Sequence, residues 1–418
     1  MNIRVRLALM LTYFLFAILL NSVGTVILQS IATFGADKIA ASKLEMYKDL
    51  PIAVVSFLVA SSLPRFGYRR AMIAGLLIVT TGALAMRFLE SFAATKLLFL
   101  MTGSAFALVK VSVYASVGLL TEDRQRHASL LNLIEGVFMI GMFSGYFLFA
   151  LFIRDNAPGA TGWLDVYWVL AGLSLLAALL LVFTPFPEQE RAAHGAGEAQ
   201  RGGLAGLAES FGAMLRLCLL PLVQVFVLSA FLYVLLEQGI GTWLPTFNSE
   251  VLHLPEAMSV MAASIFSGGI ALGRLSAGVI LRRVNWYILV NLCVLAMAAL
   301  LLLSMPLTRG LEPLEDVTWL TAPLAVWIVP LIGLFMAPIY PVINSVMLTA
   351  LPQERHAAMT GLIVVFSALG GTTGSRVVGE VFARTSGQTA FTATLVPMAA
   401  ILVTLWFFRR QSQRRIDA

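Results

Sequence analysis

A lysine interrupts the apolar stretch 104–120, SAFALVKVSVYASVGLL, which is long enough to cross a membrane as a helix. This residue, Lys110, would lie at bilayer depth, where a cation costs about 2.5 to 3.5 kcal/mol on insertion scales. A charge at that depth is expected to have a partner or a function. Because an ammonium group attracts anions, Lys110 is the first candidate for binding chemistry in this chain.

Glu135 is the expected partner of this lysine. If the two helices end near Leu120 and Ala128, a rise of about 1.5 Å per residue puts Lys110 about 15 Å and Glu135 about 11 Å from the same membrane boundary. The short segment TEDRQRH joins the helices, so they run antiparallel and should be neighbours. Opposite charges at similar depth are predicted to pair and to remain ionised.

Four more ionisable residues lie inside apolar stretches: Glu237, Arg274, Arg376 and Glu380. Arg376 and Glu380 are four residues apart, and this spacing predicts an ion pair within one helix. Glu237 lies in a stretch that also carries other polar side chains, which favours a binding role over a purely structural one.

Polar side chains recur every four residues in three of the apolar stretches, which places them on one helix face. A single Asn or Thr in such a place is equally well explained by an interhelical hydrogen bond, worth about 0.6 kcal/mol on average. As a set, however, these positions favour a site for a small polar molecule. The candidate contacts are Asn21, Thr25, Gln29, Lys110, Tyr114, Tyr233, Glu237, Gln238, Tyr340 and Asn344.

The elements that position these residues are predicted to be membrane-spanning helices. The chain has 418 residues, of which 59% are hydrophobic and 12% charged, and its mean hydropathy is +0.89. Soluble domains carry about 25% charged residues, so we predict an all-α polytopic membrane protein. A spanning helix needs about 20 apolar residues, and twelve runs qualify: 7–32, 47–63, 71–89, 95–120, 128–153, 164–184, 216–247, 257–281, 286–306, 319–349, 357–381 and 388–408.

The basic residues predict the orientation of the chain. With twelve spans both termini lie on one side, and most Arg residues between the spans fall on that side. The opposite side holds fewer basic residues, among them Lys38, Lys43 and Lys48. The positive-inside rule then places both termini in the cytoplasm, and we expect a bacterial-type inner (plasma) membrane.

An internal repeat divides the chain into two halves. The segments RQRHASLLNLIEGVFMIGMFSG and QERHAAMTGLIVVFSALGGTTG match at one constant offset, including the glycine pairs Gly141/Gly145 and Gly370/Gly374. Small residues four apart let membrane helices approach closely. We predict two six-helix pseudo-repeats, an N-terminal half at 1–184 and a C-terminal half with a short tail at 216–418, joined by a cytoplasmic linker at 185–215.

Two inner segments, SSLPRFGYRR and GRLSAGVILRRVNW, carry a Gly-and-Arg motif. On this motif, and over essentially the whole chain, the sequence resembles the major facilitator superfamily of transporters. The resemblance implies gating roles for Arg65, Arg69, Arg70 and Arg274. The family motif has an aspartate where this chain has Pro64 or a neighbour. The patches EQGIGTWLPTF, APIYPVINSV and RHASLLNLIEG are most similar to the fucose–galactose–glucose:proton symporter group, the L-fucose permease-like transporters.

The resemblance implies a secondary active transporter that works by alternating access. We expect its substrate to be a small polar solute, a sugar or a sugar-acid-like molecule, with proton coupling. In the similar group, helix one carries an aspartate and helix four a glutamate. This chain has Thr25 or a neighbour at the first place and Lys110 at the second. Proton coupling would therefore use Glu135 or Glu237, and Lys110 could attract an anionic substrate.

Other functions are less well supported by the residues. A drug or metabolite exporter of the same superfamily would have a more apolar cavity, and a transport-inactive sensor would carry a cytoplasmic domain. The four histidines fall in loops or at helix ends, Cys218 and Cys293 have no metal-ligand spacing, and no Walker-type loop occurs. We expect no enzyme activity, no metal, no cofactor and no nucleic-acid partner, and a monomer in the lipid bilayer.

Overall fold

The structure is a computed structural model that describes residues 3–59, 63–120, 124–154, 160–184, 204–313 and 317–416. Every regular element within these ranges is a helix. Eleven of the helices described there are long and apolar enough to cross a membrane, and α2 (Val23–Phe34) is a shorter apolar helix. The predicted fold class, an all-α polytopic membrane protein, is confirmed.

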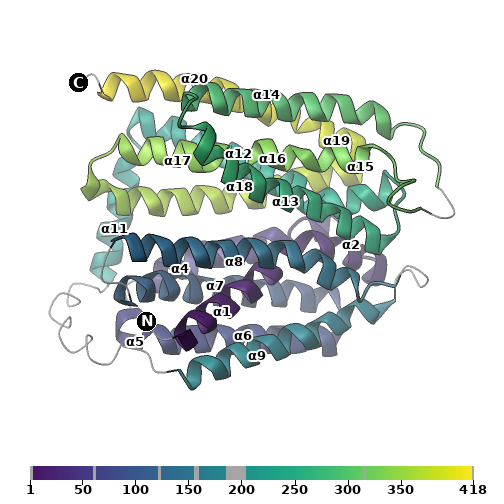
Figure 1. The fold of residues 1–418 in the computed structure, drawn as a ribbon, viewed down its shortest axis with the longest axis horizontal. Coiled ribbons are helices and arrows are strands. Elements are labelled where there is room, and N and C mark those ends of the chain that lie inside the picture. The colour runs from purple at the N-terminus through teal and green to yellow at the C-terminus, as the bar shows by residue number, and fades with distance from the viewer. Residues whose placement is uncertain are drawn as a thin grey trace. The chain divides into compact units, whose positions relative to one another are not determined.

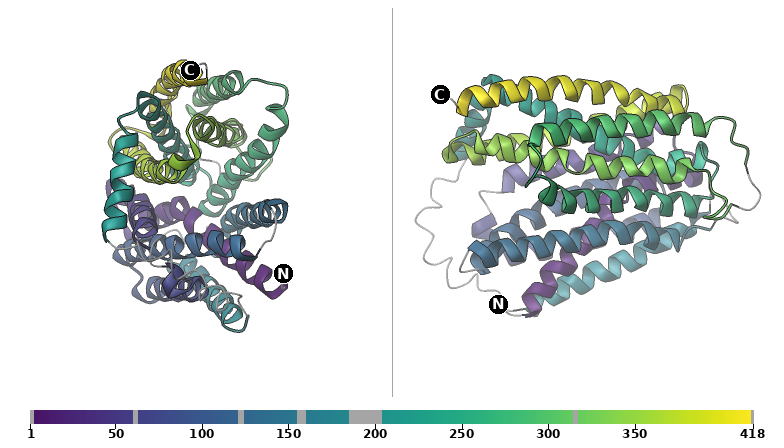
Figure 2. Two further views of the ribbon diagram at one scale, coloured as in Figure 1. Left: turned by 90° about the vertical axis from the view of Figure 1, so that its left-hand side faces the viewer. Right: turned by 45° about the horizontal axis from the view of Figure 1, so that its top comes forward.

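The chain forms two compact units. The first contains 1–23, 47–152 and 160–210, and the second contains 24–46, 153–159 and 211–418. In Figure 1 the long helices of each unit run side by side, and the end-on view in Figure 2 shows the helices of each unit gathered into a bundle. The predicted linker 185–215 lies outside the described residues up to position 203.

The first unit is built mainly from four helix pairings, α1 with α8 and α9, and α6 with α7 and α9. Its core is apolar and aromatic, with Phe16, Phe99 and Trp163 fully buried. The elements are α1 (Ile3–Asn21), α4 (Leu44–Val59, from Tyr47 on), α5 (Leu63–Phe66), α6 (Tyr68–Leu89), α7 (Phe92–Leu120), α8 (Arg124–Ala150), η1 (Thr161–Asp165) and α9 (Val166–Val182).

The second unit is centred on α12, which packs against α18, α20 and α13. It also contains α2 and the short α3 (Lys38–Ala41) from the beginning of the chain. The later elements are α11 (Leu204–Leu217, from Phe211 on), α12 (Pro221–Glu250), α13 (Glu256–Ile280), α14 (Trp286–Ser304), η3 (Met305–Thr308), α15 (Ala325–Ile328), η4 (Val329–Leu331), α16 (Ile332–Met336), α17 (Ile339–Thr349), η5 (Gln353–Arg355), α18 (His356–Arg384), α19 (Gly387–Ala393) and α20 (Leu395–Ile416).

The predicted glycine faces hold equivalent helix pairs together in the two units. In the first unit, a Cβ at Gly141 of α8 would lie 2.6 Å from the Phe14 carbonyl oxygen of α1. In the second unit, a Cβ at Gly370 of α18 would lie 2.5 Å from the Phe231 carbonyl oxygen of α12. Any larger residue would push the helices apart, so both positions require glycine. The sequence repeat therefore corresponds to a repeated packing contact.

The predicted first span, 7–32, is not one continuous helix. Ser22 belongs to neither α1 nor α2, and the backbone hydrogen bond from the Gly24 amide to the Leu20 carbonyl, expected in a continuous helix, is absent between these two described residues. The Ser22 hydroxyl instead donates to the Leu19 carbonyl at 2.8 Å. The prediction of a single helix was wrong because side chains take over bonds of the helical ladder here.

Lys48 does not lie in an outer segment as the charge count predicted. It belongs to α4, and its side chain is only 7% exposed. The sequence places it at the start of an apolar run, where a lysine normally marks the membrane boundary. Its actual position is explained by a hydrogen bond from its Nζ to the Leu20 carbonyl oxygen at 3.2 Å, within the first unit.

The predicted span 319–349 consists of several short pieces, α15, η4, α16 and α17. Pro330 lies in η4, and Pro338 precedes α17, which contains Pro341 near its start. Proline removes a backbone donor and clashes with the preceding turn, so it interrupts an α-helix. The prediction that prolines break this span is confirmed.

Candidate functional site

The first polar cluster lies in the first unit, where α1, α7 and α8 contribute side chains. Lys110 and Tyr114 follow each other by one turn on α7, and Glu135 faces them from α8. The Tyr114 hydroxyl donates a hydrogen bond to Glu135 Oε1 at 2.6 Å. A tyrosine hydroxyl bound to a carboxylate is a strong, charge-assisted contact. The sequence prediction that α7 and α8 bring Lys110, Tyr114 and Glu135 together agrees with this geometry.

The direct ion pair predicted between Lys110 and Glu135 is not formed. No nitrogen–oxygen contact within 4.0 Å joins these two described residues, although Glu135 is close enough for an electrostatic attraction. The Lys110 ammonium instead lies 5.8 Å from the centre of the Phe106 ring. Tyr114 has taken the place of Lys110 as the hydrogen-bond donor to the carboxylate. Lys110 is exposed, so its ammonium is accessible to a ligand.

Aromatic rings surround this cluster. The Tyr13 ring of α1 lies 6.2 Å from Phe106 and 5.9 Å from Phe138, both measured between ring centres. Tyr13 is 1% exposed, and its hydroxyl has no hydrogen-bond partner among the described residues. The sequence interpretation missed Tyr13. The four-residue spacing of Asn21 and Thr25 would have reached it if extended two steps toward the N-terminus.

The second polar cluster lies in the second unit, on α12, α13, α17 and α18. The rings of Tyr233 and Tyr340 are stacked with their centres 5.3 Å apart and an angle of 21° between their planes. The Tyr340 hydroxyl shares a hydrogen bond with the Ser367 hydroxyl at 2.7 Å. Asn344 follows Tyr340 by one turn on α17 and interacts with its hydroxyl. Ser367 was not predicted, because a serine in an apolar helix carries no distinctive sequence signal.

Glu237 and Arg274 form an ion pair in the second cluster. Arg274 Nη2 lies 3.7 Å from Glu237 Oε1, which joins α12 to α13. Both groups are partly exposed, at 18% for the Glu237 side chain and 37% for the Arg274 side chain. Gln238, beside Glu237 in sequence, is half-buried on α12. The ion pair gives Arg274 a partner that the sequence did not predict for it.

The predicted stripe on the first span is divided by the break at Ser22. Asn21 lies at the end of α1, where its side-chain amide donates to the Ala17 carbonyl at 2.8 Å. Thr25 is buried on α2 at 1% exposure. The Gln29 amide donates to Glu256 Oε2 at 2.7 Å within the second unit. The three residues therefore do not share one continuous helix face.

The predicted gating arginines differ in their surroundings. Arg69 donates hydrogen bonds to the carbonyl oxygens of Leu181 at 2.8 Å and of Val182, at the end of α9. A cation in this place satisfies free carbonyls and interacts favourably with the helix dipole. Arg70 is exposed, and the side chain of Arg65 lies outside the described residues. A gating role for these residues stays a prediction.

The predicted pair of Arg376 and Glu380 is not formed. Glu380 Oε1 accepts instead from Arg384 Nη2 at 2.6 Å, one turn further along α18. Arg376 is exposed. Two arginines four residues away on either side compete for one carboxylate, and only the pair with Arg384 is formed.

Neither cluster resembles a metal site. Within the part of the chain that the structure describes, no group of three His, Cys, Asp or Glu residues could hold a metal ion. Cys218 and Cys293 are free thiols, and burial raises the pKa of Cys218, which lies between α11 and α12. The two clusters instead combine a carboxylate, a cation and tyrosine hydroxyls. Such groups can bind hydroxyl-bearing solutes and can exchange a proton.

Comparisons with known proteins agree with this architecture. The family pattern described as Major Facilitator Superfamily matches residues 9–375. No curated protein matches the chain. The solved structure of the nucleoside transporter NupG is 15% identical, with a TM-score of 0.70 over 98% of this chain and 99% of that one. The D-xylose-proton symporter is 14% identical, with a TM-score of 0.69 over 96% of both chains.

A third solved structure, the transporter FucP in its outward conformation, is 17% identical, with a TM-score of 0.58 over 96% of this chain and 98% of that one. At such identities the likeness concerns the fold. It supports the predicted arrangement of twelve transmembrane helices as two six-helix pseudo-repeats.

Proposed function

The chain belongs to the major facilitator superfamily, and from this premise we propose that it is a secondary active transporter of a small polar solute. The solute is sugar-like or sugar-acid-like, and its movement is coupled to protons through alternating access. Members of this family are integral membrane transporters, which fits the eleven apolar spans of the described residues. A proton gradient is the proposed energy source, because the chain contains no Walker-type phosphate loop.

The observation that carries this proposal is the contact between Tyr114 and Glu135 beside the accessible Lys110. Intramembrane ionisable residues mark substrate and proton pathways in transporters. Glu135 provides a carboxylate that can take a proton, Tyr114 provides a donor that a solute can displace, and Lys110 provides a cation that a solute carboxylate or hydroxyl can contact. The rings of Tyr13, Phe106 and Phe138 provide apolar faces on which a sugar ring can pack.

The proposed coupling follows from competition for these groups. When a solute hydroxyl or carboxylate engages Tyr114 and Lys110, Glu135 loses its hydrogen-bond donor and its nearest cation. The ionised carboxylate is then less stable, so Glu135 binds a proton. Loss of the solute restores the Tyr114 contact and releases the proton. Glu237 is the second candidate for proton binding, with Arg274 as its counter-ion.

The second unit supplies the other proposed contacts. The stacked rings of Tyr233 and Tyr340, with Asn344 and Gln238 nearby in sequence, combine aromatic faces with amide donors and acceptors. The names of the similar structures support a sugar-containing solute, since one is a D-xylose-proton symporter and another a nucleoside transporter. Both kinds of solute carry a sugar ring.

Counterflow in proteoliposomes tests the proposed substrate class. Vesicles that contain the purified protein are loaded with one unlabelled solute and exposed to the same labelled solute, across a panel of neutral sugars, sugar acids, nucleosides and lipophilic cations. Exchange of a sugar, sugar acid or nucleoside supports the proposal. Exchange of lipophilic cations alone would indicate a drug or metabolite exporter, and no exchange of any solute would indicate a transport-inactive protein.

The same proposal includes an orientation and an assembly state. The basic residues favour cytoplasmic termini in an inner (plasma) membrane, and we propose a monomer. Arg65, Arg69, Arg70 and Arg274 are proposed to gate the inner side. Protease accessibility of the C-terminal tail in right-side-out vesicles, and the mass of the detergent-solubilised particle, check the first two points.

A further inference from the structure

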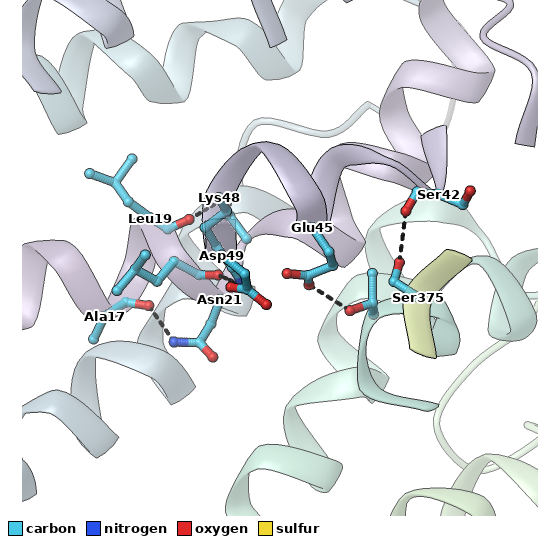
Figure 3. A network of polar contacts seen from close by, with 11 residues as sticks. Ala17, Leu19, Asn21, Ser42, Glu45, Lys48, Asp49 and Ser375 are labelled. Carbon is cyan, nitrogen blue, oxygen red and sulfur yellow. Dashed lines mark hydrogen bonds and ion pairs between the residues drawn. The ribbon is translucent and has the colours of Figure 1, made fainter. Parts of the chain in front are cut away.

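The break in the first span brings a buried ion pair next to an open backbone carbonyl. Lys48 Nζ lies 3.2 Å from the Leu20 carbonyl oxygen and 3.5 Å from Asp49 Oδ1. The side chains of Lys48 and Asp49 are 7% and 14% exposed. Figure 3 shows both side chains at the end of α1, close to Asn21. All of these residues belong to the first unit.

The position of this group within the membrane makes its charges significant. Leu20 follows the predicted start of the first span, residue 7, by 13 residues, which is about 20 Å along the helix. The hydrocarbon core is about 30 Å thick, so the break lies inside it. Backbone groups that lose their helical partner there cost several kcal/mol unless another group satisfies them. The Lys48 ammonium satisfies the Leu20 carbonyl.

The surroundings leave few other charges to influence this pair. Lys48 packs through its backbone against Gly103 of α7. The turns of α1 and α7 that face α4 carry no charged residue, and the nearest on α7 are Lys96 and Lys110, seven residues on either side of Gly103. On α4 itself, Glu45 precedes Lys48 by three residues and accepts a hydrogen bond from the Thr242 hydroxyl at 2.7 Å.

Two acceptors therefore compete for one ammonium group. In a continuous helix the Leu20 carbonyl would accept from the Gly24 amide, and Lys48 would be free to bind Asp49 alone. In the broken helix the ammonium is shared with Leu20, so the Asp49 carboxylate is less fully compensated. A less compensated buried carboxylate takes up a proton more readily. The state of the helix and the protonation of Asp49 are thus linked.

We propose that Asp49, held beside Lys48 at the break of the first span, is a second proton-binding site whose protonation favours the broken helix. Proton binding to Asp49 releases the ammonium to the Leu20 carbonyl. Loss of that proton draws the ammonium back to Asp49 and allows the Leu20–Gly24 hydrogen bond to form. By linkage, a proton that stabilises the break is bound more tightly when the break is present. The chain passes from the first unit to the second directly after this break, at Val23 and Gly24.

This site is separate from the proposed coupling at Glu135 and acts without solute. The test is hydrogen–deuterium exchange of the amides of residues 22–26 in the full chain in nanodiscs, without added solute, between about pH 5 and about pH 8 and corrected for intrinsic exchange. In the wild type, protection of these amides is expected to be about fivefold or more greater at the higher pH. Asp49→Asn is expected to remove this pH dependence.

Two matched variants isolate the effect. Asp37→Asn makes the same chemical change at an exposed residue outside α4 and should behave as the wild type. Glu135→Gln should also leave the exchange unchanged, whereas it alters solute coupling if the proposed function holds. An Asp49→Asn protein that retains the full pH dependence overturns the proposal. If that variant does not fold, Asp49→Glu must shift the pH midpoint of protection, and an unchanged midpoint overturns the proposal equally.

Discussion

The Tyr114 hydroxyl donates a hydrogen bond to Glu135 Oε1 at 2.6 Å, and this contact joins α7 to α8 in the first unit. It replaces the direct ion pair that the depths of Lys110 and Glu135 predict. A neutral donor satisfies the carboxylate, and the ammonium of Lys110 is left near the Phe106 ring. The cluster can therefore meet an incoming solute with an accessible cation, and this has consequences for binding and for coupling.

Tyr114→Phe removes the donor and leaves the ring. A hydrogen bond to a charged group contributes about 1.5 to 3 kcal/mol, so the balance between the protonated and ionised forms of Glu135 no longer depends on displacement of the tyrosine. We expect accumulation driven by a pH gradient to fall several-fold while counterflow persists. Paired uptake and counterflow assays on the same vesicles check this. Unchanged accumulation would show that Tyr114 has no part in coupling.

Lys110→Met removes the ammonium but keeps an apolar chain of similar length. If Lys110 contacts a solute carboxylate, the variant should bind sugar acids about tenfold or more weakly, as expected for a charged hydrogen bond. Neutral sugars should be affected less. Ligand-induced changes in melting temperature of the purified protein provide the measurement, and Lys110→Arg is the charge-conserving control. An equal loss for both classes of solute would contradict a role in anion binding.

Glu237→Gln tests the ion pair of the second unit. The variant keeps the shape of the side chain but leaves Arg274 without its carboxylate at 3.7 Å. Because both groups are partly exposed, the cost in stability should be small, about 0 to 1 kcal/mol. We expect a larger effect on solute affinity than on melting temperature. The reverse result, a large loss of stability with normal binding, would assign Glu237 to the structure.

Gly141→Leu tests the close contact between α1 and α8. The first atom of any side chain would approach the Phe14 carbonyl oxygen to 2.6 Å, and overpacking of this kind costs about 1 to 3 kcal/mol. The melting temperature should fall. Gly136→Leu, on the same helix with nothing within 4 Å of its added Cβ, is the matched control and should change it little. Equal effects of the two substitutions would argue against the glycine contact.

Charged residues made the first cluster predictable, because Lys110 and Glu135 stand out in apolar stretches and their helices are joined by a short segment. Tyr13 and Ser367 belong to the observed clusters but were missed, since tyrosine and serine are ordinary residues in membrane helices. The four-residue spacing of Asn21, Thr25 and Gln29 assumed an unbroken helix, which Ser22 prevents.

The break itself could not be predicted from its own sequence. No proline lies near Ser22, and the group that satisfies the Leu20 carbonyl is Lys48, which comes from a different helix. Lys48 in turn was placed outside the membrane because a lysine at the start of an apolar run usually marks its boundary. Both errors have the same origin, since a tertiary contact overrides the local pattern. The glycine pairs were predicted correctly because their spacing reflects the contact directly.

Proton uptake that accompanies solute binding tests the central claim most directly. The purified protein in weakly buffered solution receives a solute identified by counterflow, and a pH-sensitive dye records the protons bound. The account predicts net proton uptake by the wild type on solute binding and none by Glu135→Gln, although this variant still binds the solute. Proton uptake by Glu135→Gln equal to that of the wild type would contradict it.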